Sequence, residues 1–133
     1  MTIDCPRREE AVIDRWNRVF EVLAAEPRRQ LFVALYDTPP DRRVMLPEAA
    51  MSPAVPPDRT SIELTLRHVH LPLMERYDFI RWTNSPFRAG RGPNFEEASI
   101  VFDSLYRNAK NIPPQMVHGC HRLEREREAR NGG

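Results

Sequence analysis

The side chains that could bind a metal ion are few and widely spaced in this chain of 133 residues. Those near the two ends are Cys5, His118, Cys120 and His121. Imidazole and thiolate groups bind zinc, but this spacing matches none of the common zinc motifs. His68 and His70 lie two positions apart on an expected helix, so they point to different sides of it. The sequence therefore predicts no metal site.

Sequence motifs of the common catalytic sites are also absent. The chain has no G-x-S-x-G nucleophile motif, no glycine-rich phosphate loop and no H-E-x-x-H metalloprotease motif. We therefore expect neither catalytic residues nor a cofactor. The two cysteines are far apart, which favours a reducing compartment over a disulfide framework.

Arginine supplies almost all of the positive charge. Nineteen of the 20 basic residues are arginine, and Lys110 is the one lysine. Residues 59–95 carry six arginines against three acidic residues, whereas residues 1–58 carry eight against ten and residues 96–133 carry six basic residues against six acidic ones. The planar guanidinium group matches phosphate and guanine, so the central segment indicates a nucleic-acid partner. The base composition of a GC-rich genome is an alternative source of the arginine excess.

The elements that would position these arginines can be read from apolar spacing. Residues 11–25 and a segment that begins at Pro27 predict two amphipathic helices. A short extended piece and a short helix follow, and then a longer helix over residues 60–77 that Pro72 should kink. Residues 79–83 predict a strand. Residues 84–94 contain two prolines and two glycines, which indicates a loop.

The remaining sequence predicts one further helix and a tail. Helical spacing continues over residues 95–112, and Pro113 and Pro114 end it. The element order is that of a winged helix-turn-helix, in which one helix enters the major groove of DNA and a hairpin touches the backbone. The predicted fold is mainly α with a small β-hairpin. Its parts are an N-terminal arm (1–10), a winged helix-turn-helix domain (11–94), a C-terminal helix (95–112) and a charged, flexible tail (113–133), in which residues 118–130 form a frayed helix or are disordered.

A family resemblance supports this fold. The run from His70 to Ile80, HLPLMERYDFI, resembles the H-L-x-x-L-x-x-x-G-L-V ending of the reader helix in ArsR-type repressors, with Asp78 at the usual glycine. The segment from Phe20 to Leu31 is similar to their opening L-x-x-x-x-R-x-x-I/L. The run HVHLP resembles haloarchaeal winged-helix proteins of the ArsR-like class that carry H-x-H-L-P-x-L. Together these matches cover roughly residues 12–83.

The resemblance implies a cytoplasmic transcriptional regulator that binds double-stranded DNA, usually as a homodimer, and it supplies no effector ligand. The polar residues of the long helix and of the basic loop are the predicted DNA contacts. They are Arg59, Thr60, Ser61, Glu63, Thr65, Arg67, His68, Arg88 and Arg91. Arginine, serine and threonine side chains can contact phosphates or base edges, so this composition suits the role.

Two further expectations concern partners. The sequence pI of about 7.9 is low for a DNA-binding domain, which favours a second interpretation, a winged-helix protein-interaction module without DNA binding. The apolar stripes of the first and fifth predicted helices could pack against each other across a two-fold axis. The alternative is that the fifth helix folds back on its own chain.

No run of about 18 apolar residues occurs, so we expect no membrane span.

Overall fold

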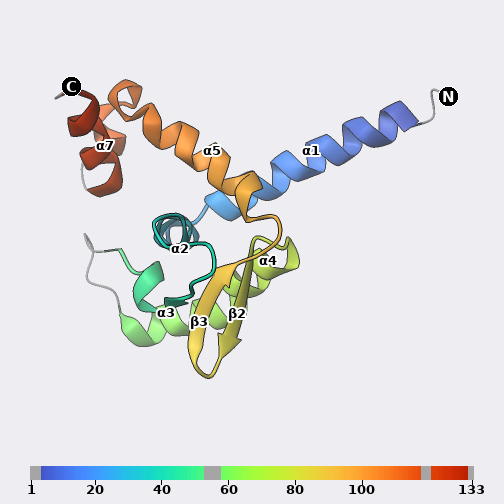
Figure 1. The fold of residues 1–133 in the computed structure, drawn as a ribbon, viewed down its shortest axis with the longest axis vertical. Helices are drawn as coiled ribbons and strands as arrows, with labels where there is room; N and C mark the ends of the chain where they lie inside the picture. The colour runs from blue at the N-terminus through green and yellow to red at the C-terminus, as the bar shows by residue number, and fades with distance from the viewer. Residues whose placement is uncertain (1–3, 53–57, 118–120, 132–133) are drawn as a thin grey trace.

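The computed structural model describes residues 4–52, 58–117 and 121–131. It is mainly helical with one small antiparallel sheet, as the sequence predicts (Figure 1). The longer helices are α1 (Asp4–Leu23), α2 (Glu26–Tyr36), α3 (Arg59–Thr65), α4 (Leu71–Arg76), α5 (Phe95–Arg107) and α7 (His121–Asn131). The short helical elements are η1 (Glu48–Ala50), η2 (Leu66–His70), η3 (Ala109–Asn111) and α6 (Pro114–Val117). The strands are β1 (Val44–Met45), β2 (Ile80–Asn84) and β3 (Phe87–Arg91).

The first helix is longer than its apolar spacing predicts. It begins at Asp4, so the expected N-terminal arm over residues 1–10 is wrong for its described part. The added turns contain arginine and glutamate, which are good helix formers, so the helix continues without an apolar face. In Figure 1 the N-terminal part of α1 projects away from the other elements, and its C-terminal part joins the core through Val19 and Val22.

Two arginines of α2 close the C-terminal end of α1. Arg28 donates from Nε to the carbonyl oxygen of Val22 at 2.8 Å and from Nη2 to that of Glu21 at 2.9 Å. Arg29 donates from Nη1 to the carbonyl oxygen of Leu23 at 2.7 Å. The last carbonyls of a helix lack partners within the helix, and cationic donors stabilise that end. The corner between α1 and α2 is therefore fixed by side chains.

The segments α3, η2 and α4 form one helical run from Arg59 to Arg76. Pro72 has no N–H and cannot make the usual helical hydrogen bond. The structure accommodates it with the π-helical turn η2, in which the N–H of Leu71 donates to the carbonyl oxygen of Leu66, five residues back. The predicted interruption at Pro72 is thus a π turn inside a continuous helix, a feature often found at functional sites.

The sheet has the strand order β1-β3-β2, and both pairs are antiparallel. β3 occupies residues that the sequence predicts as a loop, so that prediction is wrong. Its glycine and alanine have weak strand propensity, but β3 pairs with a strand on each side, and this pairing overrides propensity. Residues 85 and 86 form the turn of the β2–β3 hairpin.

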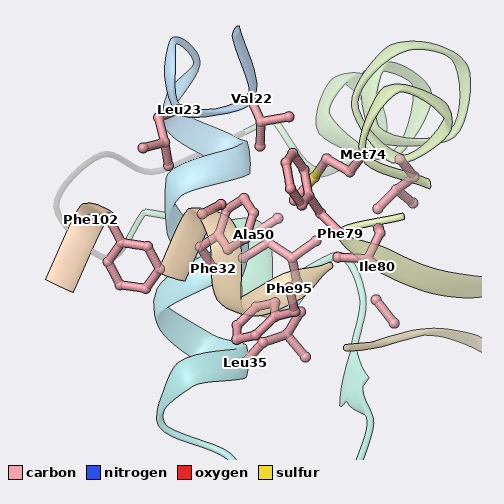
Figure 2. Close-up of a cluster of buried hydrophobic side chains, with 14 of the residues drawn as sticks. Val22, Leu23, Phe32, Leu35, Ala50, Met74, Phe79, Ile80, Phe95 and Phe102 are labelled. Atoms are coloured by element: carbon pink, nitrogen blue, oxygen red, sulfur yellow. The ribbon is translucent and has the colours of Figure 1, made fainter. Parts of the chain in front are cut away.

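The core lies where α2 meets the sheet, α4 and α5 (Figure 2). Phe32 is at its centre and is fully buried. Its ring centroid lies 6.0 Å from that of Phe79, 5.4 Å from that of Phe95 and 5.7 Å from that of Phe102. Aromatic pairs at these separations stabilise beyond the burial of their area. The α4–β2 turn, α2 and α5 are therefore joined by one aromatic cluster.

The turn between α4 and β2 depends on Asp78, which has φ of 62°. This is the left-handed conformation, which aspartate tolerates better than most other residues. The backbone around the turn is closed by Asn94, whose N–H donates to the carbonyl oxygen of Asp78 at 2.7 Å. The start of α5 is thereby attached to the start of β2.

The described part of the predicted tail is helical, which agrees with the frayed helix and not with the disordered alternative. Residues 114–117 form α6 and residues 121–131 form α7. Val117 and Leu123 are buried with Ala109 in a second small cluster, against Tyr106 and Ile112. The few apolar residues of this charged segment meet at the end of α5, which gives them enough contacts to order it. Over the described ranges, no helix has both the length and the apolar character that a membrane span requires.

Candidate nucleic-acid interface

The start of α3 is capped by Asp58. Its Oδ1 accepts hydrogen bonds from the backbone N–H groups of Thr60 at 3.1 Å and Ser61 at 3.4 Å. Asp58 is thus the N-cap of α3. These two backbone donors are therefore occupied by a carboxylate. The hydroxyl groups of Thr60 and Ser61 remain on exposed residues.

Arg59 lies among acidic side chains. Its Nη2 donates to Oε1 of Glu48 at 2.5 Å, and its Nε lies 3.6 Å from Oε1 of Glu63. The hydrogen bond from Arg59 lowers the pKa of Glu48 below its usual range. With Asp58 next to them, these groups leave the beginning of α3 without a positive excess. Arg59 is more than half exposed, but its charge is already paired.

The later polar residues of the helical run face solvent with little constraint. The hydroxyl of Thr65 donates back to carbonyl oxygens one turn earlier, at 3.2 Å. His68 lies in the π turn and is exposed. Both residues can therefore be reached by a partner that lies along this face of the helix.

Arg67 connects the π turn to the hairpin. Its Nη1 donates to Oδ1 of Asn84 at 2.7 Å. Its Cζ lies 3.8 Å from the centroid of the Phe87 ring, which places the guanidinium over the ring face. Asn84 and Phe87 are paired across the hairpin turn, so both strands contact the same guanidinium. Sequence spacing could not reveal this contact, because the partners are 17 and 20 residues away from Arg67.

Arg88 lies on the outer face of the sheet and is exposed. The register pairs it with Met45 on β1 and Thr83 on β2. Side chains alternate between the faces of a strand, so these three point away from the side on which Ala89 is buried. Within the described part of the chain, no ion pair engages Arg88. Arg88, which the sequence predicts on a loop, thus lies on strand β3 next to Phe87.

Arg43 adds a positive charge to this face that the sequence analysis did not select. It immediately precedes β1, and its Cγ lies 3.2 Å from the position that a β-carbon on Gly90 would occupy. Its side chain therefore lies over β3, and the residue is exposed. The pair Arg42-Arg43 before a short strand is the signal that could have pointed to it.

Arg91 lies on β3, so its predicted position on a loop is wrong. It lies at the end of β3 far from the turn, opposite Ile80. Its Nη2 donates to the carbonyl oxygens of Leu35 at 2.9 Å and Thr38 at 2.9 Å. Its Cζ lies 4.7 Å from the ring centroid of Phe95. The register of β3 thus directs Arg91 to the C-terminal end of α2, where it holds helix carbonyls.

His70 attaches the other side of the π turn to the α1–α2 corner. Its Nδ1 lies 2.9 Å from Nη1 of Arg28, a residue that is only 8% exposed. Because the guanidinium is a donor, Nδ1 must accept this hydrogen bond, and the imidazole is neutral. Burial first, and then the charge of Arg28, lower the pKa of His70. His70 therefore has the packing role that distinguishes it from the exposed His68.

The described residues contain no cluster of three or more His, Cys, Asp or Glu side chains suited to a metal ion. Cys5, His118, Cys120 and His121, the residues weighed for zinc, lie outside the side chains that the structure describes. The candidate interface thus consists of an acidic helix start, Arg67 against the hairpin, and the exposed Arg43 and Arg88 on the sheet. Comparison with family models, with curated proteins and with solved structures gives no match.

Proposed function

We propose that this chain is a cytoplasmic winged-helix transcriptional regulator that occupies promoter DNA and catalyses no reaction. One observation carries the proposal. The helical run from Arg59 to Arg76 packs against β2, and its π turn is joined through Arg67 to the β2–β3 hairpin. A helix beside a basic hairpin is the arrangement that winged-helix proteins place on adjacent grooves of DNA.

The charges of the surface support a division of roles. Arg88 and Arg43 are exposed, so they suit contacts with the phosphate backbone, which fix position but carry no sequence information. Arg67 and His68 are neighbours in the π turn and are the proposed base contacts. Arg91 is not part of the proposed interface, because its guanidinium holds the end of α2.

The interaction module is the second candidate, and a specific observation favours it. Glu48, Asp58 and Glu63 gather around Arg59 at the start of α3, where a DNA-binding helix would approach phosphates. Carboxylates at this place repel DNA, although a glutamate can accept a hydrogen bond from the cytosine amino group. A basic surface of a partner protein would match these carboxylates.

Binding to duplex DNA at several salt concentrations separates the two candidates. Wild type should bind with an affinity that falls as salt rises, because phosphate contacts release counterions. Arg88→Ala should weaken binding to all sequences about equally and reduce the slope of log K against log salt by about one unit. Arg107→Ala is the control, since Arg107 is exposed on α5 and paired with Asp103.

The two outcomes are distinct. A slope that falls for Arg88→Ala and stays unchanged for Arg107→Ala supports DNA binding through the hairpin. Absence of salt-dependent binding by wild type to any duplex contradicts the DNA-binding proposal and favours the interaction module. Recovery of genomic DNA bound to the tagged protein then identifies the preferred sequence.

We also propose that the chain is a homodimer, through α1 rather than through α1 and α5. α5 folds back on its own chain, with Arg15 of α1 and Glu97 of α5 joined at 2.7 Å. The remaining apolar strip of α1 lies within about 100° of helix arc, at 3.6 residues per turn, and is at least half exposed. It consists of Val12, Ile13, Trp16 and Phe20. Packing the same strip of a second copy against it gives a two-fold interface, the commonest type of dimer contact.

Sedimentation velocity at micromolar concentration tests this dimer. Wild type should sediment as a dimer, and Trp16→Ala should shift the population toward monomer, because Trp16 stacks on Phe20 at 5.9 Å in the strip. Large exposed aromatic residues contribute much of the binding energy of interfaces. Ile100→Ala on α5, 63% exposed but outside the strip, should leave the mass unchanged. A wild-type protein that sediments only as monomer contradicts the dimer.

A further inference from the structure

The guanidinium of Arg67 is held from two directions. The Phe87 ring lies under it at 3.8 Å, and the Asn84 side chain accepts from Nη1 at 2.7 Å. The support is itself fixed: the Trp82 ring meets Phe87 edge-on at 6.3 Å, and the hydroxyl of Thr83 donates to the carbonyl oxygen of Pro86 at 2.6 Å. The hairpin turn therefore forms a platform under Arg67.

This platform leaves part of the guanidinium available. Among the described residues, Nη1 has a hydrogen-bond acceptor, while Nε and Nη2 have none. A guanidinium carries five N–H donors in a planar fork, so the edge with Nε and Nη2 can still bind a base edge or a phosphate. An arginine that is ordered before binding loses less side-chain entropy when it binds.

Each of the other candidate arginines lacks either a guanidinium that is held in place or N–H donors that are free to bind DNA. Arg59 shares its charge with Glu48 and Glu63. Arg91 gives its donors to carbonyl oxygens of the chain. Arg88 is exposed, and within the described residues no hydrogen bond or ring contact fixes its guanidinium. Arg67 combines a fixed position with free donors, and both are needed to discriminate bases.

We propose that Asn84 and Phe87 are positioning residues that hold Arg67 in the orientation in which it reads DNA. This inference rests on the proposed function. Neither residue needs to contact DNA itself, and both act through the guanidinium. The hairpin then has two parts in recognition: Arg88 contacts the backbone, and the turn residues set the sequence preference of a side chain that belongs to the helix.

The test uses the duplex that wild type selects from a randomised pool and a scrambled duplex of the same composition. Asn84→Ala should reduce the ratio of the two affinities by about 3- to 10-fold, the range expected when one ordered side chain becomes free. The salt slope should stay unchanged, because no charge is removed. Phe87→Leu should have the same effect, while Phe87→Tyr, which keeps the ring, should retain the wild-type ratio.

Variants of Arg67 itself complete the test. Arg67→Lys keeps the charge but loses the planar fork, so it should lower the ratio as far as Arg67→Ala does. The double variant Arg67→Ala/Asn84→Ala should lose no more than Arg67→Ala alone. If the reductions in the affinity ratio from the two single variants add up in the double variant, Asn84 contacts DNA directly, which overturns the positioning role. Asn111→Ala, an exposed asparagine near the end of α5, is the matched control.

A measurement without DNA distinguishes this inference from the proposed function. The NMR signal of the Arg67 Nε–H should show a ring-current shift that Phe87→Leu removes. Loss of preference in Asn84→Ala together with this shift supports the inference. An unshifted Nε–H signal, or a wild-type affinity ratio in Asn84→Ala, overturns the positioning role but leaves the proposed DNA binding in place. Absence of binding by wild type to either duplex overturns both.

Discussion

Replacing Leu71 with alanine should lower the free energy of unfolding by about 2–5 kcal/mol, the range for a large-to-small change in a packed core. Leu71 is fully buried in the main cluster with Phe32 and Leu66. It also follows the π turn directly, and its N–H makes the hydrogen bond that defines that turn. The cavity left by the substitution would thus lie under the helical run that carries the proposed base contacts.

Urea denaturation followed by circular dichroism measures this effect. Leu64→Ala is the control, because Leu64 belongs to α3 of the same run but is 54% exposed. A surface substitution of this kind should change stability by no more than about 0.5 kcal/mol. Equal midpoints for wild type and Leu71→Ala would contradict the placement of Leu71 in the core.

The helices were the predictable part of this fold. In α2 the apolar residues recur at helical spacing, and Leu31, Phe32 and Leu35 are all buried, as their periodicity predicts. The same argument holds for Phe95 and Phe102 in α5. Periodicity is a local signal, and it is reliable where one face of a helix meets the core.

The errors in β3 and α7 occurred where a long-range contact decides local structure, whereas the added turns of α1 follow from the local helix propensity of arginine and glutamate. Nothing in the segment FRAGR predicts a strand, and β3 forms because β1 and β2 pair with it on both sides. Likewise Leu123 gives α7 no amphipathic face, yet it is buried against Val117 and Ala109. In both cases the partner lies outside the window in which a sequence pattern can be recognised.

The candidate site shows the same division. The helix that carries Arg67 could be predicted, but its contacts with Asn84 and Phe87 depend on how the hairpin packs against that helix. Arg91 was misplaced because the register of β3, and not the position of the glycines, decides which arginine lies near the turn. The arginine content of the sequence indicated contacts with phosphates and bases, and the tertiary structure decides which arginines remain available for such contacts.

The junction between the hairpin and α4 leaves no space for a side chain at Gly92. A β-carbon there would lie 2.4 Å from the carbonyl oxygen of Asp78 and 2.8 Å from the backbone nitrogen of Ile80. The N–H of Gly92 also donates to the carbonyl oxygen of Phe79 at 2.9 Å. The close approach is between two backbone segments, so no flexible side chain can move to relieve it.

Gly92→Ala should therefore destabilise the protein by about 3 kcal/mol or more, at the upper end of the range for overpacking, because the backbone itself must shift. Gly90→Ala is the matched control two residues earlier. Its added carbon would meet Cγ of the exposed Arg43 at 3.2 Å, and that side chain can move aside. We expect the control to change stability by less than about 1 kcal/mol. Denaturant midpoints of the two variants, measured side by side, check the difference. Equal midpoints would mean that the Asp78 turn and the end of β3 are not in the close contact on which the position of the hairpin depends.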